Sequence, residues 1–289
     1  MLRDLTRILV EGARGAVRLR VEGRSFARGS VPTWLTTAAD FDIVGLREGS
    51  TEVTIEAPRL IDAAPVLFQQ QHLFHPFDAS RTAIDLLEES IAEAAGGQLD
   101  TELYDQPLLS RMTEFDRVLA AGYEGIHMGG AAAAEERVVV RAETVHVVEQ
   151  LLKRTPQPQN VRISGKLDLI RHSDRMFVLV MPDGQSIKGV AEGVTPTKLV
   201  ELFGCNVTMT GTAVFRPAGR VLRLEADDVQ PAGDDSGVWS RMPMPLFRSV
   251  ETAELRRPQG PRSGVNAIFG RWPGEESDDD FAGAIEALS

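Results

Sequence analysis

His72 and His75 have a spacing that two ligands of one metal ion can have, in the segment His72-Leu73-Phe74-His75. A protein zinc site needs three or four ligands, and the sequence suggests no third ligand for this pair, which Pro76 follows at once. We therefore expect no metal site here. The two histidines are expected in a loop or in a partly buried position.

Cys205 is the single cysteine of the 289 residues, which excludes an internal disulfide and a Cys-based zinc site. It follows Gly204 at the start of an expected strand and has no evident partner base, so we expect a buried thiol and not a nucleophile.

Neither a GxGxxG pattern nor a Walker-type motif occurs. We expect a protein that is not an enzyme and needs no cofactor. An enzyme in residues 1–158 stays a third alternative, because carboxylates that only the fold brings together leave no local motif.

The chain is acidic, with 31 Lys and Arg against 42 Asp and Glu and a net charge of −11. This balance argues against broad, sequence-independent binding to nucleic acid, which needs many cations facing phosphates. The charge is unevenly distributed. The last fifteen residues, 275–289, contain six acidic side chains and no Lys or Arg.

Residues 275–289 are predicted to form a short amphipathic helix. Ser277 is a suitable N-cap, and acidic residues in the first turn oppose the positive end of the helix dipole. About twelve residues are marginal for an isolated helix in water, so the apolar stripe is expected to form against a partner. The residues expected to bind that partner are Trp272, Glu276, Asp278, Asp279, Asp280, Phe281, Ile285 and Leu288.

The segment Trp272-Pro273-Gly274-Glu275-Glu276-Ser277-Asp278, with the acidic and apolar residues after it, resembles the C-terminal tails of small bacterial antitoxins. Those antitoxins are encoded beside PIN-domain ribonuclease toxins. The resemblance implies capture of a PIN-type nuclease, whose carboxylates hold Mg²⁺ or Mn²⁺ and whose cationic surface binds RNA. An acidic tail would occupy that surface and exclude the substrate. The resemblance covers about 18 residues, and residues 1–270 resemble no family that we recognise.

Residues 1–158 are predicted to form one α+β domain. Alternating apolar residues over 16–23 indicate a half-buried strand. Residues 41–58 indicate two strands around a turn. Apolar residues at three- and four-residue spacings predict a helix within 80–97, ended by glycines, and another over 142–156. A further helix is expected over about 106–121, and a surface connection over 129–136.

Residues 159–232 are predicted to form a small five-stranded OB-like β-barrel, because three strand patterns, a short helix and two more strand patterns follow in that order. An SH3-like barrel or an open sheet is the alternative. Phe203 and Phe215 are expected in the core. OB folds can bind oligonucleotides on a basic groove. The candidate nucleic-acid-binding residues are Arg162, Lys166, Arg171, Arg175 and Lys188.

Residues 233–274 are rich in Pro, Gly and Ser and are predicted to be a linker before the acidic helix of 275–289. Within the linker, residues 242–247 could dock as an extended apolar strip. No run of residues approaches the length of a membrane span, and the first residues carry charges where a signal peptide needs an apolar core. We expect a cytoplasmic protein.

The sequence thus favours a bacterial interaction protein, without enzymatic activity, that acts as an antitoxin-like inhibitor. Its expected partner is a protein, plausibly a co-encoded PIN-type toxin. The alternative is a nucleic-acid-binding OB-fold protein whose acidic tail is autoinhibitory or recruits other proteins.

Overall fold

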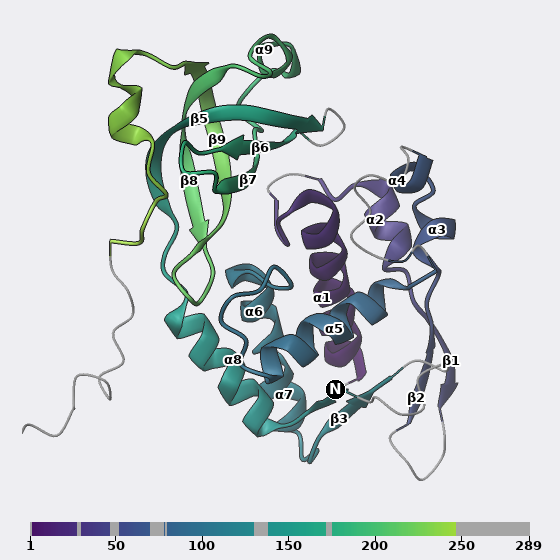
Figure 1. Cartoon of the computed structure of the whole chain (residues 1–289). Helices are drawn as coiled ribbons and strands as arrows, with labels where there is room; N and C mark the ends of the chain where they lie inside the picture. The colour runs from purple at the N-terminus through teal and green to yellow at the C-terminus, as the bar shows by residue number, and fades with distance from the viewer. Residues whose placement is uncertain are drawn as a thin grey trace, which may run out of the picture. The chain divides into compact units, whose positions relative to one another are not determined.

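Figure 1 shows the computed structural model of the chain. The residues that it describes are 2–27, 30–46, 52–69, 78, 80–129, 138–171 and 175–246. Residues 1–248 form one compact unit, in which helices and two short hairpins precede a closed five-stranded barrel. The expected mixed α+β class with a small barrel is therefore confirmed. Two separate hydrophobic cores lie within this unit, one among the helices and one inside the barrel.

Helices make up most of the region before the barrel. They are α1 (Leu2–Glu22), α2 (Thr33–Ala38), α3 (Leu60–Ala63), α4 (Val66–Gln69), α5 (Ala83–Ala95), α6 (Gln106–Met112), α7 (Phe115–Leu119) and α8 (Ala142–Arg154). Two antiparallel hairpins, β1 (Asp42–Leu46) with β2 (Val53–Glu56) and β3 (Ile126–Met128) with β4 (Val138–Val140), accompany them.

The strand predicted over 16–23 is wrong, because residues 16–22 belong to α1. The alternation of Val17, Leu19 and Val21 misled the prediction, since all three are buried in a helix with neighbours on several sides. Small residues allow this close packing: a Cβ at Gly12 would lie 3.1 Å from Leu87 of α5, which leaves little room for a larger side chain. Strict alternation over six residues is therefore also compatible with a central helix.

The other helix predictions hold with one change. Helix α5 begins with a capping box, in which Thr82 and Asp85 each accept a hydrogen bond from the other's backbone N–H. Helix α8 buries Val145, Val148 and Leu151 of the apolar stripe predicted for it, and Leu152, its fourth member, is partly buried. The single helix expected over 106–121 is instead α6 and α7, with a break at residues 113–114. The expected hairpin of 41–58 is confirmed as β1 and β2, whereas the pairing of β3 with β4 was not predicted.

The barrel closes in the strand order β5-β6-β7-β9-β8, with β8 returning to β5. Strands β7 and β9 pair in parallel, and the other neighbours are antiparallel. Its elements are β5 (Gln159–Arg171), β6 (Met176–Val180), β7 (Ser186–Val190), α9 (Pro196–Glu201), β8 (Asn206–Phe215) and β9 (Val221–Pro231).

The barrel interior is filled by apolar side chains from every strand, among them Ile163, Phe177 and Val229. Glycine is required where β7 meets β9, because a Cβ on Gly189 would lie 2.5 Å from the carbonyl oxygen of Leu224. The helix α9 has the expected position between β7 and β8, with Thr195 at its N-cap.

After β9 the chain forms a short 3₁₀ helix, η1 (Asp234–Trp239), beside β5. Of the apolar strip expected to dock, Met242 packs against the barrel core, whereas Met244 and Leu246 are exposed. The rest of the predicted linker, from residue 247, and the predicted acidic helix lie outside the described residues. Among the helices that are described, none is long and apolar enough to cross a membrane.

Candidate functional site

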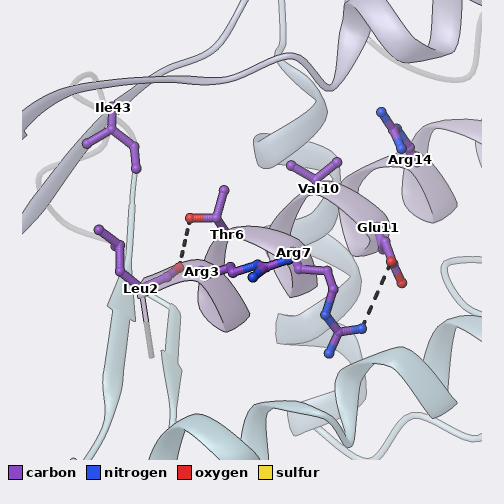
Figure 2. Close-up of a pocket in the computed structure, with 8 residues that line it drawn as sticks. All are labelled: Leu2, Arg3, Thr6, Arg7, Val10, Glu11, Arg14 and Ile43. Carbon is purple, nitrogen blue, oxygen red and sulfur yellow. Dashed lines mark hydrogen bonds and ion pairs between the residues drawn. The ribbon is translucent and has the colours of Figure 1, made fainter.

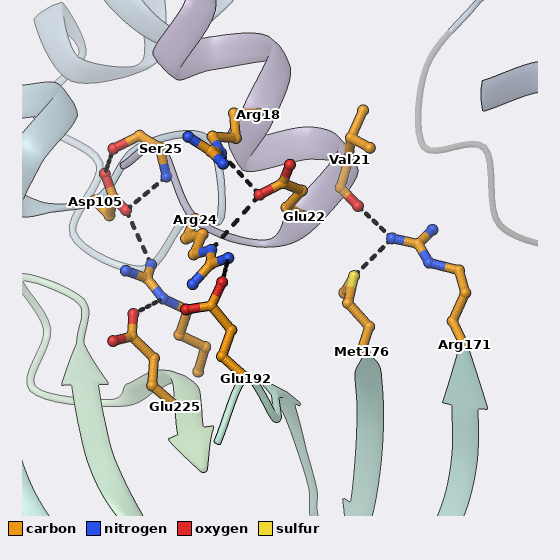
Figure 3. Close-up of polar contacts among 11 residues, drawn as sticks. Arg18, Val21, Glu22, Arg24, Ser25, Asp105, Arg171, Met176, Glu192 and Glu225 are labelled. Atoms are coloured by element: carbon orange, nitrogen blue, oxygen red, sulfur yellow. Dashed lines mark hydrogen bonds and ion pairs between the residues drawn. The ribbon is translucent and has the colours of Figure 1, made fainter. Parts of the chain in front are cut away.

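A buried carboxylate, Asp105, joins the helical region to the barrel. Its position follows from local sequence, because it is the N-cap of α6 and accepts from the Leu108 backbone N–H at 3.2 Å. It also accepts from the Ser25 backbone N–H at 3.0 Å and from the Ser25 hydroxyl. Arg223 of β9 completes the set, with Nη1 donating to Asp105 Oδ2 at 2.9 Å. Figure 3 shows Asp105 and Ser25 facing each other above the barrel strands.

A second set of charges surrounds Arg24, which follows the end of α1. Arg24 pairs with Glu192 of the barrel, and Glu22 lies 3.6 Å from its Nε and 2.7 Å from Nε of Arg18 (Figure 3). The hydrogen bond from Arg24 holds the pKa of Glu192 below its usual range. The same bond raises the pKa of Arg24. These charges are therefore matched across the junction.

Further ion pairs lie at the side of the junction where the β8–β9 turn approaches the segment after α5. Arg216 binds Asp100 at 2.7 Å and Glu102 at 2.9 Å, and Arg220 binds Asp100 at 2.7 Å. The bond from Arg216 contributes most to lowering the pKa of Asp100. A backbone hydrogen bond from Ala218 to Leu99, 3.0 Å long, fixes the turn against this segment.

The exposed face of α1 carries a separate open groove of about 580 Å³ (Figure 2). Apolar, polar and charged side chains of α1 line it at helical spacings, together with Ile43 of β1. Its lining consists of Leu2, Arg3, Thr6, Arg7, Val10, Glu11, Arg14 and Ile43. Arg7 is held by Glu114 at 2.8 Å, a hydrogen bond that raises the pKa of Arg7. The Nε of Arg14 is buried without a hydrogen-bond partner in the described part of the chain.

The five basic residues predicted as a nucleic-acid-binding patch have partners within the chain. Lys188 pairs with Glu102 at 2.7 Å, and Arg171 donates to the Val21 carbonyl (Figure 3). The remaining three also lie beside acceptors or a ring. Arg175 donates to the Glu192 carbonyl at 2.7 Å, Lys166 lies 3.4 Å from Asp168, and Arg162 lies 3.8 Å from Asp235 and 5.2 Å from the Trp239 ring centre.

Three predictions about individual side chains can be compared with the structure. Cys205 is exposed, so the expected buried thiol is wrong. Phe203 is also exposed and not in the core, because α9 is short and turns only Leu199 fully inward. Phe215 is buried, as expected.

The predicted partner-binding site consists of eight residues near the C-terminal end of the sequence. All eight of them, from Trp272 to Leu288, lie outside the described residues, as do His72 and His75. Across the described ranges, no three His, Cys, Asp or Glu side chains are grouped so that they could hold a metal ion.

Of the residues at the junction, Arg171 and Lys188 belong to the predicted basic patch, whereas Asp105, Arg223 and Glu192 had no predicted role. Asp105, Arg223 and Glu192 are each isolated in the sequence, and nothing local to them indicates a partner more than eighty residues away. The one available signal was the N-cap pattern at Asp105 before Pro107, which predicts a helix start but not a second role.

The junction holds the helical region against the barrel, since many of its charged groups form pairs across it. Comparison of the chain with protein-family models, with curated proteins and with solved structures finds no match. The function must therefore be inferred from the residues themselves.

Proposed function

We propose that this chain is a bacterial, cytoplasmic interaction protein that captures a partner through residues 272–289, as an antitoxin-like inhibitor. The observation that carries the proposal is the order Trp-Pro-Gly-Glu-Glu-Ser-Asp at 272–278, followed by acidic residues and an apolar stripe. This pattern resembles antitoxin tails, and the partner that it implies is a PIN-type ribonuclease toxin.

The energetics of such a tail are favourable but modest. Burying Phe281, Ile285 and Leu288 would contribute about 1.5 to 3 kcal/mol each. Folding a segment on binding costs roughly 2 to 5 kcal/mol. Trp272 adds a further apolar anchor, and the acidic residues add attraction to a cationic surface. Because salt screens the attraction between exposed charges, we expect high salt to release the partner from the tail.

We further propose that the barrel is an OB fold. Its five strands are β5, β6, β7, β8 and β9 in chain order. Around the barrel, the fifth strand, β9, lies between the third, β7, and the fourth, β8, and it is parallel to β7. A helix lies between the third and fourth. This order supports the assignment, since an OB fold is a five-stranded Greek-key barrel.

The contacts of the barrel favour protein capture over the nucleic-acid-binding alternative. In OB folds, oligonucleotides bind on the face of the second and third strands, which correspond here to β6 and β7. On this face Lys188 pairs with Glu102, and Met176 lies against Arg171 near the end of α1. The outward side chains of β6 are aliphatic or thioether and offer no ring on which bases could stack.

The experiment compares the full chain with a chain that ends at Arg271. Each is co-expressed with the product of the adjacent reading frame, and the complex is isolated through a tag on this chain. We expect the adjacent frame to encode a PIN-type nuclease, the full chain to retain it and inhibit its RNA cleavage, and the shortened chain to lose both properties.

A matched pair of variants separates specific contacts from charge alone. Replacing Phe281, Ile285 and Leu288 by Ser should weaken capture at least tenfold, whereas Thr252→Ser in the preceding segment should leave it unchanged. An adjacent frame without a nuclease, or capture that survives the truncation, contradicts the proposal. Tighter binding of a labelled 20-nucleotide RNA by the shortened chain, measured by fluorescence anisotropy, would favour the alternative.

A further inference from the structure

A cavity of about 410 Å³ lies between α1, the segment after α5 and the outer face of the barrel. Its volume falls within the range of roughly 300 to 1,000 Å³ that is typical of small-molecule sites. Apolar side chains from the helical region and from the barrel line it, among them Leu19, Leu103, Met176, Val178 and Leu222. Such a wall gains packing contacts when an apolar molecule fills the space.

Two cations that line the cavity are already bound within the chain. Arg223 is only 6% exposed and pairs with Asp105 and with Glu225, each at 2.9 Å. Arg171 donates to the Val21 carbonyl, as Figure 3 shows. Neither arginine therefore needs an anion from a ligand.

A third cation of the cavity, Arg20, is paired with an acid of the same wall. Its side chain is 7% exposed, and its Nη2 lies 3.1 Å from Oε2 of Glu89. The other terminal nitrogen, Nη1, has no hydrogen-bond partner among the described residues, but it is buried and out of reach of a ligand. An anionic ligand at this place would lie beside Glu89, and a cationic one beside Arg20.

Lys188 and Glu102 form the more exposed ion pair of the cavity wall. Their side chains are 56% and 49% exposed, with 2.7 Å between Nζ and Oε2. Arg216 binds the other oxygen of Glu102 at 2.9 Å. Because an ammonium group has three donors, Lys188 can stay paired with Glu102 and still donate to a neutral oxygen. The pair therefore suits a hydroxyl group better than a further charge.

We propose that this cavity binds an uncharged, largely apolar small molecule that carries a hydroxyl group. The hydrocarbon part lies along the apolar wall, and the hydroxyl lies beside Lys188 and Glu102. A charged ligand would lose its water without gaining an unpaired counter-ion, which is unfavourable, whereas a hydrocarbon gains by leaving water. The ligand contacts both the helical region and the barrel, so it stabilises the folded protein. The site shares no residue with 272–289, so this proposal does not depend on the function proposed above.

The test compares three ligands with the same alkyl chain, 1-octanol, octanoate and octylammonium, by isothermal titration calorimetry with the full chain at pH 7. Val178→Trp fills the cavity from β6, and Leu103→Trp fills it from the segment after α5. The matched control is Val200→Trp, because Val200 of α9 is 58% exposed and does not line the cavity. Glu102→Gln removes the carboxylate that neutralises Lys188.

We expect octanol to bind saturably, and at least tenfold more tightly than either charged ligand. Val178→Trp and Leu103→Trp should each weaken octanol binding at least tenfold, and Val200→Trp should leave it unchanged. Glu102→Gln should tighten octanoate binding at least fivefold, because Lys188 then lacks its counter-ion.

Thermal unfolding verifies that each variant is folded, and either of the two cavity-filling variants is decisive should the other not fold. Four results overturn the proposal. They are the absence of saturable octanol binding, octanoate or octylammonium binding as tight as that of octanol, octanol binding that a folded cavity-filling variant leaves unchanged, and octanoate binding that Glu102→Gln does not tighten.

Discussion

Arg223 of the barrel and Asp105 of the helical region form a buried ion pair, with 2.9 Å between Nη1 and Oδ2 and side-chain exposures of 6% and 0%. Asp105 at the same time caps α6 and binds Ser25. One carboxylate therefore connects a helix start, the chain after α1 and strand β9. The stability of the junction should depend strongly on this pair.

Removing one member of the pair should be costly, because the other charge stays buried without its partner. We expect Arg223→Met to lower the free energy of unfolding by about 3 kcal/mol, measured by urea denaturation. The double variant Arg223→Met with Asp105→Asn should be less destabilised than the sum of the single variants, by at least about 0.5 kcal/mol. Strict additivity would contradict a direct interaction.

The control for this measurement is an exposed ion pair of the same barrel. Lys198 binds Asp228 at 2.8 Å, and both side chains are about two-fifths exposed, at 41% and 42%. We expect Lys198→Met to cost less than about 1 kcal/mol. The contrast between the two variants isolates the effect of burial.

We expect Glu192 to make the stability of the folded protein fall at acidic pH. Its pKa lies below the ordinary value of 4.5 because Arg24 donates to it. The pair therefore stabilises the folded state above about pH 4.5, and this contribution is lost as the pH falls through the folded-state pKa. We expect Glu192→Gln to lower the melting temperature at pH 7. The difference from the unaltered protein should shrink as the pH falls below 4.5, and a constant difference would contradict this role.

Glu88 of α5 should have the opposite effect. Burial, and then the charge of Asp85, raise its pKa from 4.5 to about 7. Because the folded state holds the proton more tightly than the unfolded state, stability falls as the pH rises from about 4.5 to 7. The full shift in pKa corresponds to about 3.4 kcal/mol, and solvent screening of this partly exposed side chain reduces it. We therefore expect Glu88→Gln to stabilise the protein by about 2 kcal/mol at pH 8 and little at pH 4.5. Glu201→Gln, on the exposed end of α9, serves as the control and should change stability equally little at both pH values.

The barrel was largely predictable because each of its elements has a local signal. Alternation of Ile163 and Leu167 with polar residues, the Asp183-Gly184 turn and the Thr195-Pro196 helix start all depend on residues close in sequence. The helical conformation of residues 16–22 was not predictable in the same way. The burial of α1 depends on α5 and α6, which pack around it and come later in the chain.

The α+β class, the order of the barrel strands along the chain and the concentration of acidic residues in 275–289 all follow from the order of the residues. Which charges meet depends on how the chain folds. Asp105 and Arg223 are 118 residues apart, and Arg24 and Glu192 are 168 apart. The physical reason is that periodicity and capping act between neighbours in the chain. Ion pairs and cavities depend instead on distances that arise only when the helical region packs against the barrel.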